Sequence, residues 1–175
     1  MSAASLLSRI AILGAESTGK STLAPRLAAH YGTLWVPEYL REFVETQQRV
    51  PFEDDQLGIA RTQRAREDEM AASREARRFL FCDTTPLLTA VYSRIYWGRV
   101  PPELLALEAE HDYALTLVAG LDLPWVPDGL QRESEAVRRQ VHECLLAVLR
   151  ERGIPFTLVE GDLPRRMRQV EALLG

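Results

Sequence analysis

The chain has 175 residues and a formal net charge of −4. A chain of this length can bury enough surface to fold as one α/β domain without disulfides or metals. Its acidic balance argues against a protein whose main partner is nucleic acid, because binding phosphates requires a basic face. The two cysteines have no metal-site spacing, and no apolar run approaches the roughly 18 residues of a membrane-spanning helix. We therefore expect a cytoplasmic protein without a membrane or nucleic-acid partner.

In chain order, short apolar segments alternate with segments of helical spacing. Strands are predicted at residues 9–13, 34–36, 79–82, 113–118 and 156–159. Helices are predicted at residues 21–31, 37–44, 53–78, 86–97, 101–111, 133–152 and 163–174. Pro25 lies deeper than the first turn of its helix, so a local distortion or a missing hydrogen bond is expected there. The alternation predicts a parallel sheet with helices on both faces, in one domain over residues 1–175.

The segment after the first predicted strand has the pattern G-x-x-x-x-G-K-[ST] and opens a helix, which is the context that a P-loop for ATP requires. Its glycines let the backbone curl so that successive N–H groups and the helix N-terminus point at a phosphate. The lysine would reach the β- and γ-phosphates, and Ser21 would place its hydroxyl on Mg²⁺. The expected nucleotide-binding residues are Gly14, Ala15, Glu16, Ser17, Thr18, Gly19, Lys20, Ser21 and Thr22.

Lys20 is the only lysine in the chain, so the other 20 of its 21 basic residues are arginine. The two residue types are nearly interchangeable on a solvated surface. A planar guanidinium, however, cannot replace a compact ammonium beneath a loop that wraps phosphates. The position of the single lysine in the motif therefore indicates a chemical requirement, and we expect Lys20 to be catalytic.

Asp83 closes the third predicted strand, where P-loop proteins place the acidic residue that holds magnesium through water or orients the nucleophile. We expect it to be a catalytic, metal-binding and substrate-binding residue. The alternative is a plain N-cap for the next helix, which Thr84 or Thr85 can also cap.

Glu38 and Arg41 begin the helix after the second predicted strand, and ligands bind beyond the carboxyl ends of such strands. The two residues lie one turn apart, so both side chains can project toward the same crevice. The alternative is an ordinary surface ion pair, which contributes little to stability.

Residues 121–132 combine two prolines, a glycine and a tryptophan between a strand and a helix, which is typical of a lid that closes over bound nucleotide. Arg132 could supply positive charge to the transferring phosphoryl group, or could simply be an arginine at the start of a helix.

Three aromatic residues, Tyr92, Tyr96 and Trp97, fall at helical spacing and are expected to belong to the core rather than to a stacking site. The three histidines are scattered and have no metal-site spacing, so no chemistry is expected of them.

Four blocks together make the chain similar to the ribosylnicotinamide kinase domain of NadR-type proteins, a group within the P-loop kinases. They are GAESTGKST at residues 14–22, PEYLREF at residues 37–43, FCDTT at residues 81–85 and PWVPDGLQR at residues 124–132. A weaker helical block with Ile59, Ala60 and Gln63 lies between the second and third. The P-loop alone is common to many kinases and ATPases, whereas the second and fourth blocks are much more specific.

The resemblance implies transfer of the γ-phosphate of ATP to the 5′-hydroxyl of nicotinamide riboside, which gives nicotinamide mononucleotide. It also implies a set of substrate-binding residues, namely Glu38, Tyr39, Arg41, Asp83, Trp125 and Asp128. The chain departs from the family pattern at Gln131, which stands where the lid arginine is expected, so that Arg132 follows one residue later. It departs again at Thr85, where a second acid is expected, and this departure bears on the identity of the acceptor.

Larger proteins of that family carry an adenylyltransferase domain, and sometimes a helix-turn-helix domain, ahead of the kinase domain. Since the first predicted strand begins near Arg9, we expect neither domain, no adenylyltransfer and no DNA binding.

The sequence thus predicts a three-layer P-loop fold whose five-stranded parallel sheet has the order 2-3-1-4-5, with a lid at about residues 121–132. Asp83, or alternatively Glu38, would orient or deprotonate the acceptor hydroxyl, while Lys20, Mg²⁺ and a lid arginine stabilise in-line transfer. Two alternatives stay open. One is a kinase for another nucleoside or small alcohol, and the other is a nucleotide-dependent switch or regulatory ATPase whose lid motion controls a partner.

Overall fold

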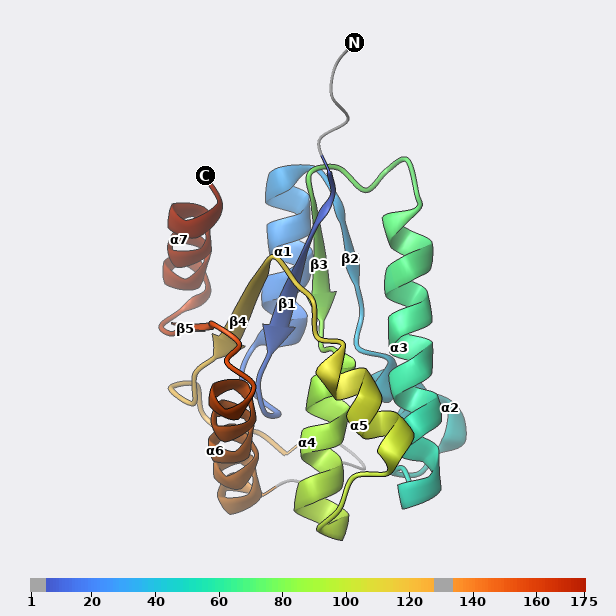
Figure 1. Cartoon of the computed structure of the whole chain (residues 1–175). Helices are drawn as coiled ribbons and strands as arrows, with labels where there is room; N and C mark the ends of the chain where they lie inside the picture. The colour runs from blue at the N-terminus through green and yellow to red at the C-terminus, as the bar shows by residue number, and fades with distance from the viewer. Residues whose placement is uncertain (1–5, 128–133) are drawn as a thin grey trace.

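The computed structural model describes residues 6–127 and 134–175. Its five strands are all parallel and form one sheet in the order β2-β3-β1-β4-β5. They are β1 (Ser8–Leu13), β2 (Leu34–Val36), β3 (Phe79–Asp83), β4 (Leu115–Ala119) and β5 (Thr157–Val159). The order predicted from the sequence is confirmed. It places the strand that leads into the P-loop beside the strand that ends at Asp83 (Figure 1).

The helices lie between the strands in the chain, as the alternation predicts. They are α1 (Lys20–Tyr31), α2 (Tyr39–Gln47), α3 (Gln56–Ala71), α4 (Pro86–Trp97), α5 (Pro102–Ala109), α6 (Glu135–Glu151) and α7 (Leu163–Leu174), with a short 3₁₀ turn, η1 (Glu53–Asp55). Helix α1 continues through Pro25, so the proline does not break it. Within the described ranges, no helix combines the length and the apolar character that a membrane crossing needs.

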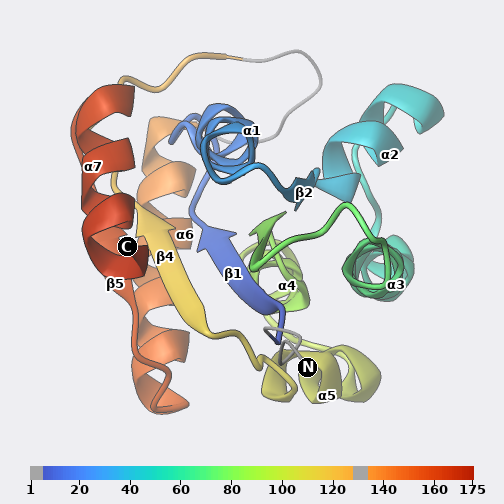
Figure 2. The same ribbon diagram turned by 90° about the horizontal axis from the view of Figure 1, so that it is seen from above.

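The two faces of β1 bury different cores, because successive side chains of a strand point to opposite faces of the sheet. Ile10 and Ile12 pack with α1 and α7 on one face. Ala11 and Leu13 pack with α4 and α6 on the other. Figure 2 shows α1 on one side of the sheet and α4 on the opposite side. Both faces of β1 are thus covered, which explains why its sequence is apolar at every position from 10 to 13.

The prediction of a helix over residues 53–78 is wrong at its end, because α3 stops at Ala71. Residues 72–78 form a turn in which Arg78 has φ 60°, a left-handed conformation that a helix cannot contain. Thr33 holds this turn, since its hydroxyl accepts from the N–H of Arg77 and donates to the carbonyl of Phe79. The contact joins residues more than 40 positions apart, so no local pattern could have predicted it.

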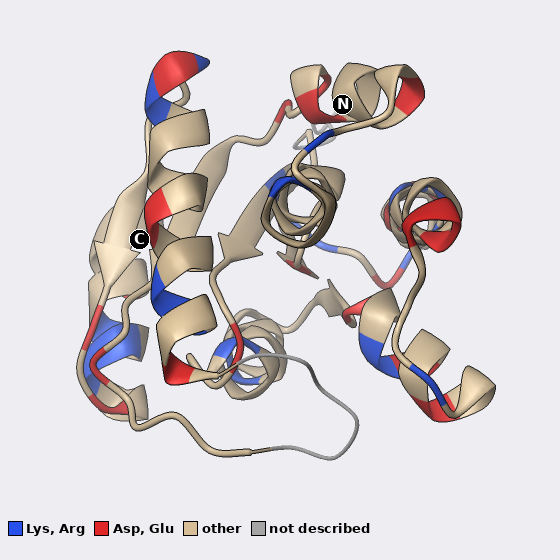
Figure 3. Cartoon of the chain, turned by 90° about the horizontal axis from the view of Figure 1, so that it is seen from below, with Lys and Arg blue, Asp and Glu red and all other residues tan. Residues whose placement is uncertain are grey.

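The carboxyl ends of the strands meet at one end of the molecule, which Figure 3 shows from below. Acidic and basic residues are interspersed over the helices at this end rather than gathered into one basic stripe (Figure 3). In sheets of this kind ligands bind in the crevice outside the carboxyl ends of the strands.

Candidate active site

The P-loop runs from the end of β1 to the start of α1 and takes backbone conformations that favour glycine. Gly19 has φ 86° and Ser17 has φ 56°. A side chain at Gly14 would bring a Cβ within 3.0 Å of the Thr18 hydroxyl and 3.2 Å of the Ala119 Cβ. The two motif glycines are therefore required by the curl of the loop and by its close approach to β4.

Lys20 and Thr18 both bond back to the same P-loop carbonyl. The buried Lys20 ammonium donates to the Ala15 carbonyl at 3.1 Å, and the Thr18 hydroxyl donates to it at 2.7 Å. These contacts hold the ammonium against the loop, at the start of α1, where the helix dipole favours an anion.

Two buried arginines hold the outer side of the P-loop, and the sequence analysis missed both. Arg138, on α6, donates to the carbonyls of Ser17 at 3.2 Å and Leu123 at 2.9 Å. Arg166, on α7, donates to the carbonyl of Thr18. Because the C=O and N–H of a trans peptide point in opposite directions, these bonds turn the next amides, of Thr18 and Gly19, to the other side.

One sequence signal could have found these arginines. Arg138 has the helical spacing of the buried residues Val141, Leu145 and Val148, so it occupies an apolar position of an amphipathic helix. Arg166 stands one turn before the buried Val170 in the same way. An arginine in the apolar phase of a helix needs buried acceptors, and here the P-loop provides them.

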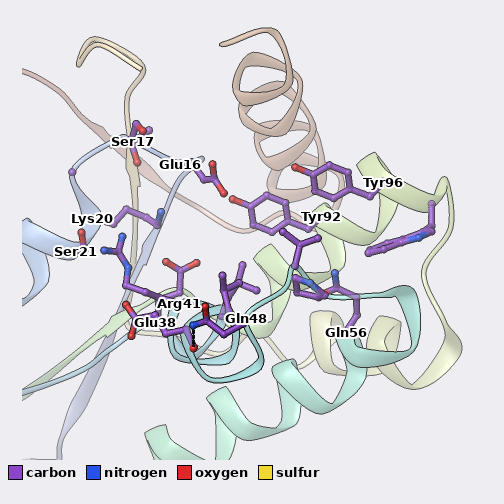
Figure 4. Close-up of a pocket in the computed structure, with 18 residues that line it drawn as sticks. Glu16, Ser17, Lys20, Ser21, Glu38, Arg41, Gln48, Gln56, Tyr92 and Tyr96 are labelled. Atoms are coloured by element: carbon purple, nitrogen blue, oxygen red, sulfur yellow. Dashed lines mark hydrogen bonds between the residues drawn. The ribbon is translucent and has the colours of Figure 1, made fainter. Parts of the chain in front are cut away.

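A cavity of about 330 Å³ extends from the P-loop to the end of α4. Figure 4 shows Lys20, Ser21, Glu38 and Arg41 together at one end, and Tyr92 and Tyr96 toward the other. Its lining residues are Glu16, Ser17, Thr18, Gly19, Lys20, Ser21, Glu38, Leu40, Arg41, Val44, Glu45, Gln48, Val50, Pro51, Gln56, Tyr92, Tyr96 and Trp97. The cavity thus joins the phosphate-binding loop to a second wall built by α2 and α4.

Asp83 is not among the residues that line this cavity, and its side chain is almost completely buried. Burial raises the pKa of Asp83 to about 7, and the nearby Glu38 charge adds to the rise, whereas Lys20 and Arg41 oppose it. One carboxylate oxygen, Oδ1, is buried without a hydrogen-bond partner. Thr85 is the N-cap residue of α4, so the alternative that Asp83 caps this helix is wrong.

Glu38 and Arg41 both line the cavity, as their spacing predicts. The ion pairs among the described residues do not join them, so the alternative of an ordinary surface pair is wrong. Tyr39 is not part of the lining, and its ring instead lies 4.8 Å from the Arg66 guanidinium. The structure therefore brings together two of the three residues expected from this block.

The expectation that Tyr92, Tyr96 and Trp97 belong to the core is wrong in part, because all three line the cavity. The rings of Tyr92 and Tyr96 are nearly parallel, with centroids 6.1 Å apart. Tyr92 is also a buried member of the core beside α6, and the partly buried Tyr96 packs against that core. Helical spacing could not separate the two roles, since α4 presents the same side to the core at its start and to the cavity at its end.

The described part of the predicted lid ends at residue 127, so Asp128 and Arg132 lie outside the described residues. The Ser17 hydroxyl donates to the Val126 carbonyl at 3.0 Å. The Val126 N–H in turn donates to the Ser17 hydroxyl oxygen at 3.4 Å. The indole N–H of Trp125 is buried without a partner, and Trp125 does not line the cavity. The segment before residue 128 is therefore fastened directly to the P-loop.

The residues present suit ATP and Mg²⁺. The P-loop amides and Lys20 would hold the phosphates, with Ser21 lining the cavity beside them. Magnesium takes few protein ligands and keeps several waters, and the unpartnered Oδ1 of Asp83 is an acceptor that such a hydrated ion would satisfy. Thr22, also predicted to bind nucleotide, is exposed and outside the lining.

Comparisons with known sequences point to one family. A family model described as AAA domain matches residues 9–166. The trifunctional NAD biosynthesis/regulator protein NadR of Salmonella typhimurium is 30% identical over an alignment of 178 positions, gaps included, that covers 95% of this chain and 42% of that protein. NadR of Escherichia coli is 32% identical over an alignment of 163 positions, gaps included, that covers 87% of this chain and 38% of that protein. The chain thus spans less than half the length of these curated relatives.

Comparisons with solved structures agree with the fold. NadR in complex with NAD and AMP-PNP has a TM-score of 0.79 at 25% identity, covering 96% of this chain and 49% of that one. NadR in complex with NR has a TM-score of 0.80 at 24% identity, covering 97% and 51%. Deoxyadenosine kinase from M. mycoides has a TM-score of 0.68 at 12% identity, covering 95% and 98%. Relatives and neighbours together support a small-molecule kinase built on a P-loop.

Proposed function

We propose that this chain, which belongs to the AAA domain family, is an ATP-dependent kinase that converts nicotinamide riboside into nicotinamide mononucleotide. The kinase class is supported by the P-loop and by the NadR relatives. The identity of the acceptor is a separate part of the proposal, and the composition of the cavity wall supports it.

The cavity wall combines aromatic rings with an excess of carboxylates. It carries three glutamates, Glu16, Glu38 and Glu45, against the two cations Lys20 and Arg41. The rings of Tyr92, Tyr96 and Trp97 stand at the end of the cavity formed by α4. Lys20 and Glu16 both belong to the phosphate-binding loop. Outside it, Glu38 and Glu45 stand against Arg41, so the acceptor meets a wall that is aromatic and acidic.

A wall of this kind favours a flat, positively charged acceptor. The base of nicotinamide riboside is a pyridinium, which carries a full positive charge on an aromatic ring. Such a ring can stack on Tyr or Trp and gains cation–π and Coulomb attraction that the neutral bases of ordinary nucleosides lack. This match between wall and base is the observation that carries the proposal.

The transfer needs little covalent chemistry from the protein. The 5′-hydroxyl oxygen of the acceptor attacks the γ-phosphorus, the bond to the β,γ-bridging oxygen breaks, and ADP leaves with that electron pair. The hydroxyl proton passes to the carboxylate of Glu38, which lines the cavity, or to that of Asp83, which interacts electrostatically with Glu38 and Lys20. Lys20 and the P-loop amides stabilise the charge on the phosphates. Bound Mg²⁺ would neutralise further charge on the β- and γ-oxygens.

The test compares two acceptors that differ only in the ring of the base, which loses both its positive charge and its aromaticity on reduction. ADP release is measured with nicotinamide riboside and with its 1,4-dihydro form, which has the same ribose and amide but an uncharged ring. We expect kcat/KM for the reduced form to be lower by about tenfold or more, the equivalent of one cation–π contact. Lys20→Ala serves as the control for contaminating kinases.

Two outcomes would contradict the proposal. Turnover without any acceptor would indicate an ATPase or switch instead of a kinase. Stimulation by adenosine or uridine but not by nicotinamide riboside would keep the kinase and exclude this acceptor.

A further inference from the structure

One buried amide on α3 joins the two segments that carry Glu38 and Asp83. Gln63 is only 2% exposed. Its Oε1 accepts from the N–H of Tyr39 at 2.8 Å. Its Nε2 donates to the Pro37 carbonyl at 3.3 Å and lies 3.5 Å from the Asp83 carbonyl. A single side chain therefore contacts the residues on both sides of Glu38 and the backbone of Asp83.

The contact with Tyr39 gives a hydrogen-bond acceptor to an N–H group at the start of α2. The first N–H groups of a helix have no partner within it, and a side chain at the N-cap usually supplies one. Glu38 is the N-cap residue of α2, yet its side chain makes no capping hydrogen bond. Gln63 provides the missing acceptor from another helix, which leaves the Glu38 carboxylate to line the cavity.

We propose that Gln63 is a positioning residue that fixes where the Glu38 and Asp83 carboxylates stand relative to each other. It does not line the cavity that runs from the P-loop to α4, so it acts through the backbone of its neighbours. The inference rests on acceptor-dependent kinase activity and is independent of which nucleoside is the acceptor. Glutamine suits the role because one amide offers both an acceptor and donors.

The principal variant is Gln63→Met, which keeps the length of the side chain and removes its hydrogen bonds. A displacement of about 1 Å at reacting groups can cost on the order of 100-fold in rate. We expect kcat with the best nucleoside acceptor to fall about 10- to 100-fold, while the KM for ATP stays within about twofold, because the P-loop is untouched. Gln63→Glu keeps the acceptor for Tyr39 and should recover part of the loss.

The matched control is Tyr113→Phe. Tyr113 donates to both oxygens of Glu67, which lies one turn beyond Gln63 on the same helix. Its loss removes another buried hydrogen bond of α3 and lowers stability without contacting Glu38 or Asp83. Unchanged kinetics in Tyr113→Phe, beside a lower kcat in Gln63→Met, would separate positioning from general destabilisation.

A double-mutant cycle asks whether Gln63 acts through Glu38. In a Glu38→Gln background, Gln63→Met should lower kcat by less than about twofold, since residues that act together are not additive. If the two substitutions lower kcat in the double variant by the product of their single effects, the proposal is overturned.

Hydrogen exchange gives a readout that needs no acceptor. The Tyr39 amide should exchange at least about tenfold faster in Gln63→Met, because its hydrogen bond is lost, and at the wild-type rate in Tyr113→Phe. Equal protection of Tyr39 in wild type and Gln63→Met would overturn the inference whatever the acceptor proves to be. Failure of nicotinamide riboside alone would instead affect only the proposed function.

Discussion

The guanidinium of Arg166 donates to the carbonyl of Thr18, and this bond ties the last helix to the P-loop across 148 residues of sequence. Arg166 also donates to the Gly161 carbonyl at 2.9 Å and pairs with the Asp122 carboxylate at 3.0 Å. Asp122 in turn accepts from the N–H of Gly161 at 2.7 Å. The P-loop thus rests on an ion pair that is buried at Arg166 and partly exposed at Asp122, and its two members come from separate segments of the chain.

Replacing Arg166 with Met should weaken ATP binding and stability together. The change leaves the Thr18 carbonyl without its donor and Asp122 without its cation. The Asp122 side chain is 34% exposed and can be solvated, so the cost comes mainly from the buried carbonyl left without a donor and is about 1–3 kcal/mol. We expect a lower melting temperature and a KM for ATP raised about tenfold or more, with the KM for the acceptor little changed. Thermal unfolding and initial rates measure the two effects.

Arg168→Met is the matched control for that variant, since Arg168 lies on the same helix with an exposed side chain. It should leave both the melting temperature and the KM for ATP near the wild-type values. Equal effects of the two substitutions would mean that the contact of Arg166 with Thr18 has no special role.

The phosphate-binding role of Lys20 can be tested by selective chemical labelling of its amine. Because it is the single lysine, an amine-reactive reagent can modify one side chain in addition to the chain's terminal amine. MgATP at saturating concentration should slow the modification of Lys20 and leave that of the terminal amine unchanged, as read by peptide mass spectrometry. Labelling of Lys20 that is indifferent to MgATP would contradict a phosphate-binding role.

Lys20→Arg should lose most of the kinase activity even though it keeps the positive charge. The ammonium lies against the Ala15 carbonyl in a space where a planar guanidinium cannot make the same contact. Loss of a group that stabilises the transition state typically costs about 100-fold or more in kcat. A Lys20→Arg variant with more than a tenth of wild-type kcat would show that charge alone suffices.

Removing the ring of Tyr96 should weaken acceptor binding selectively. Tyr96→Leu is expected to raise the KM for a cationic acceptor about tenfold, which corresponds to the loss of one favourable ring contact. Tyr96→Phe keeps the ring and removes only the hydroxyl, so it should stay within about threefold of wild type. An increase in the KM for ATP alone would place the ring on the nucleotide side instead.

His111 predicts a specific pH dependence of stability. Its ring nitrogens face the hydroxyls of Thr85 at 3.3 Å and Thr116 at 3.0 Å. The pKa of His111 is lowered to about 4, mainly by burial and also by the charge of Arg64, while Asp112 opposes both. Between the unfolded value near 6.5 and the folded value, the unfolded chain binds a proton that the folded chain does not.

The stability that this histidine contributes is therefore complete above about pH 6.5 and falls as the pH is lowered toward 4. His111→Gln, which keeps a donor and an acceptor at that place, should remove this part of the acid sensitivity. The difference in unfolding free energy between wild type and variant should change by about 2 kcal/mol from pH 7 to pH 4.5. A difference that does not vary with pH would contradict the assignment. Denaturant titrations across this range provide the measurement.

The fold could be predicted from the sequence because its signals are local. The strand at the P-loop is apolar at consecutive positions, the glycines stand where the loop curls, and Gly32 and Gly98 end helices in the left-handed conformation. Glu38 could be placed at the cavity for the same reason, since it lies two residues after a predicted strand, and Asp83 follows directly on another.

The spacing of α6 and α7 could mark Arg138 and Arg166 as buried, but the bonds of the supporting side chains could not be predicted, because they reach distant backbone carbonyls. Gln63, Arg138 and Arg166 each reach a partner that no period or spacing encodes. The cavity-lining role of the aromatic residues on α4 was not predicted for another reason. A helix that passes from the core to a cavity keeps one periodicity throughout, so the spacing of Tyr96 alone cannot show that its ring also lines the cavity.

The single cavity shared by the P-loop and α4 also determines the kind of kinetics to expect. A nucleotide held by Lys20 and an acceptor held beside Tyr96 would occupy one continuous space with no partition between them. The phosphoryl group can then pass straight from donor to acceptor, without resting on a side chain of the enzyme. Double-reciprocal plots at several fixed acceptor concentrations should accordingly intersect, as they do for a ternary complex, and not run parallel.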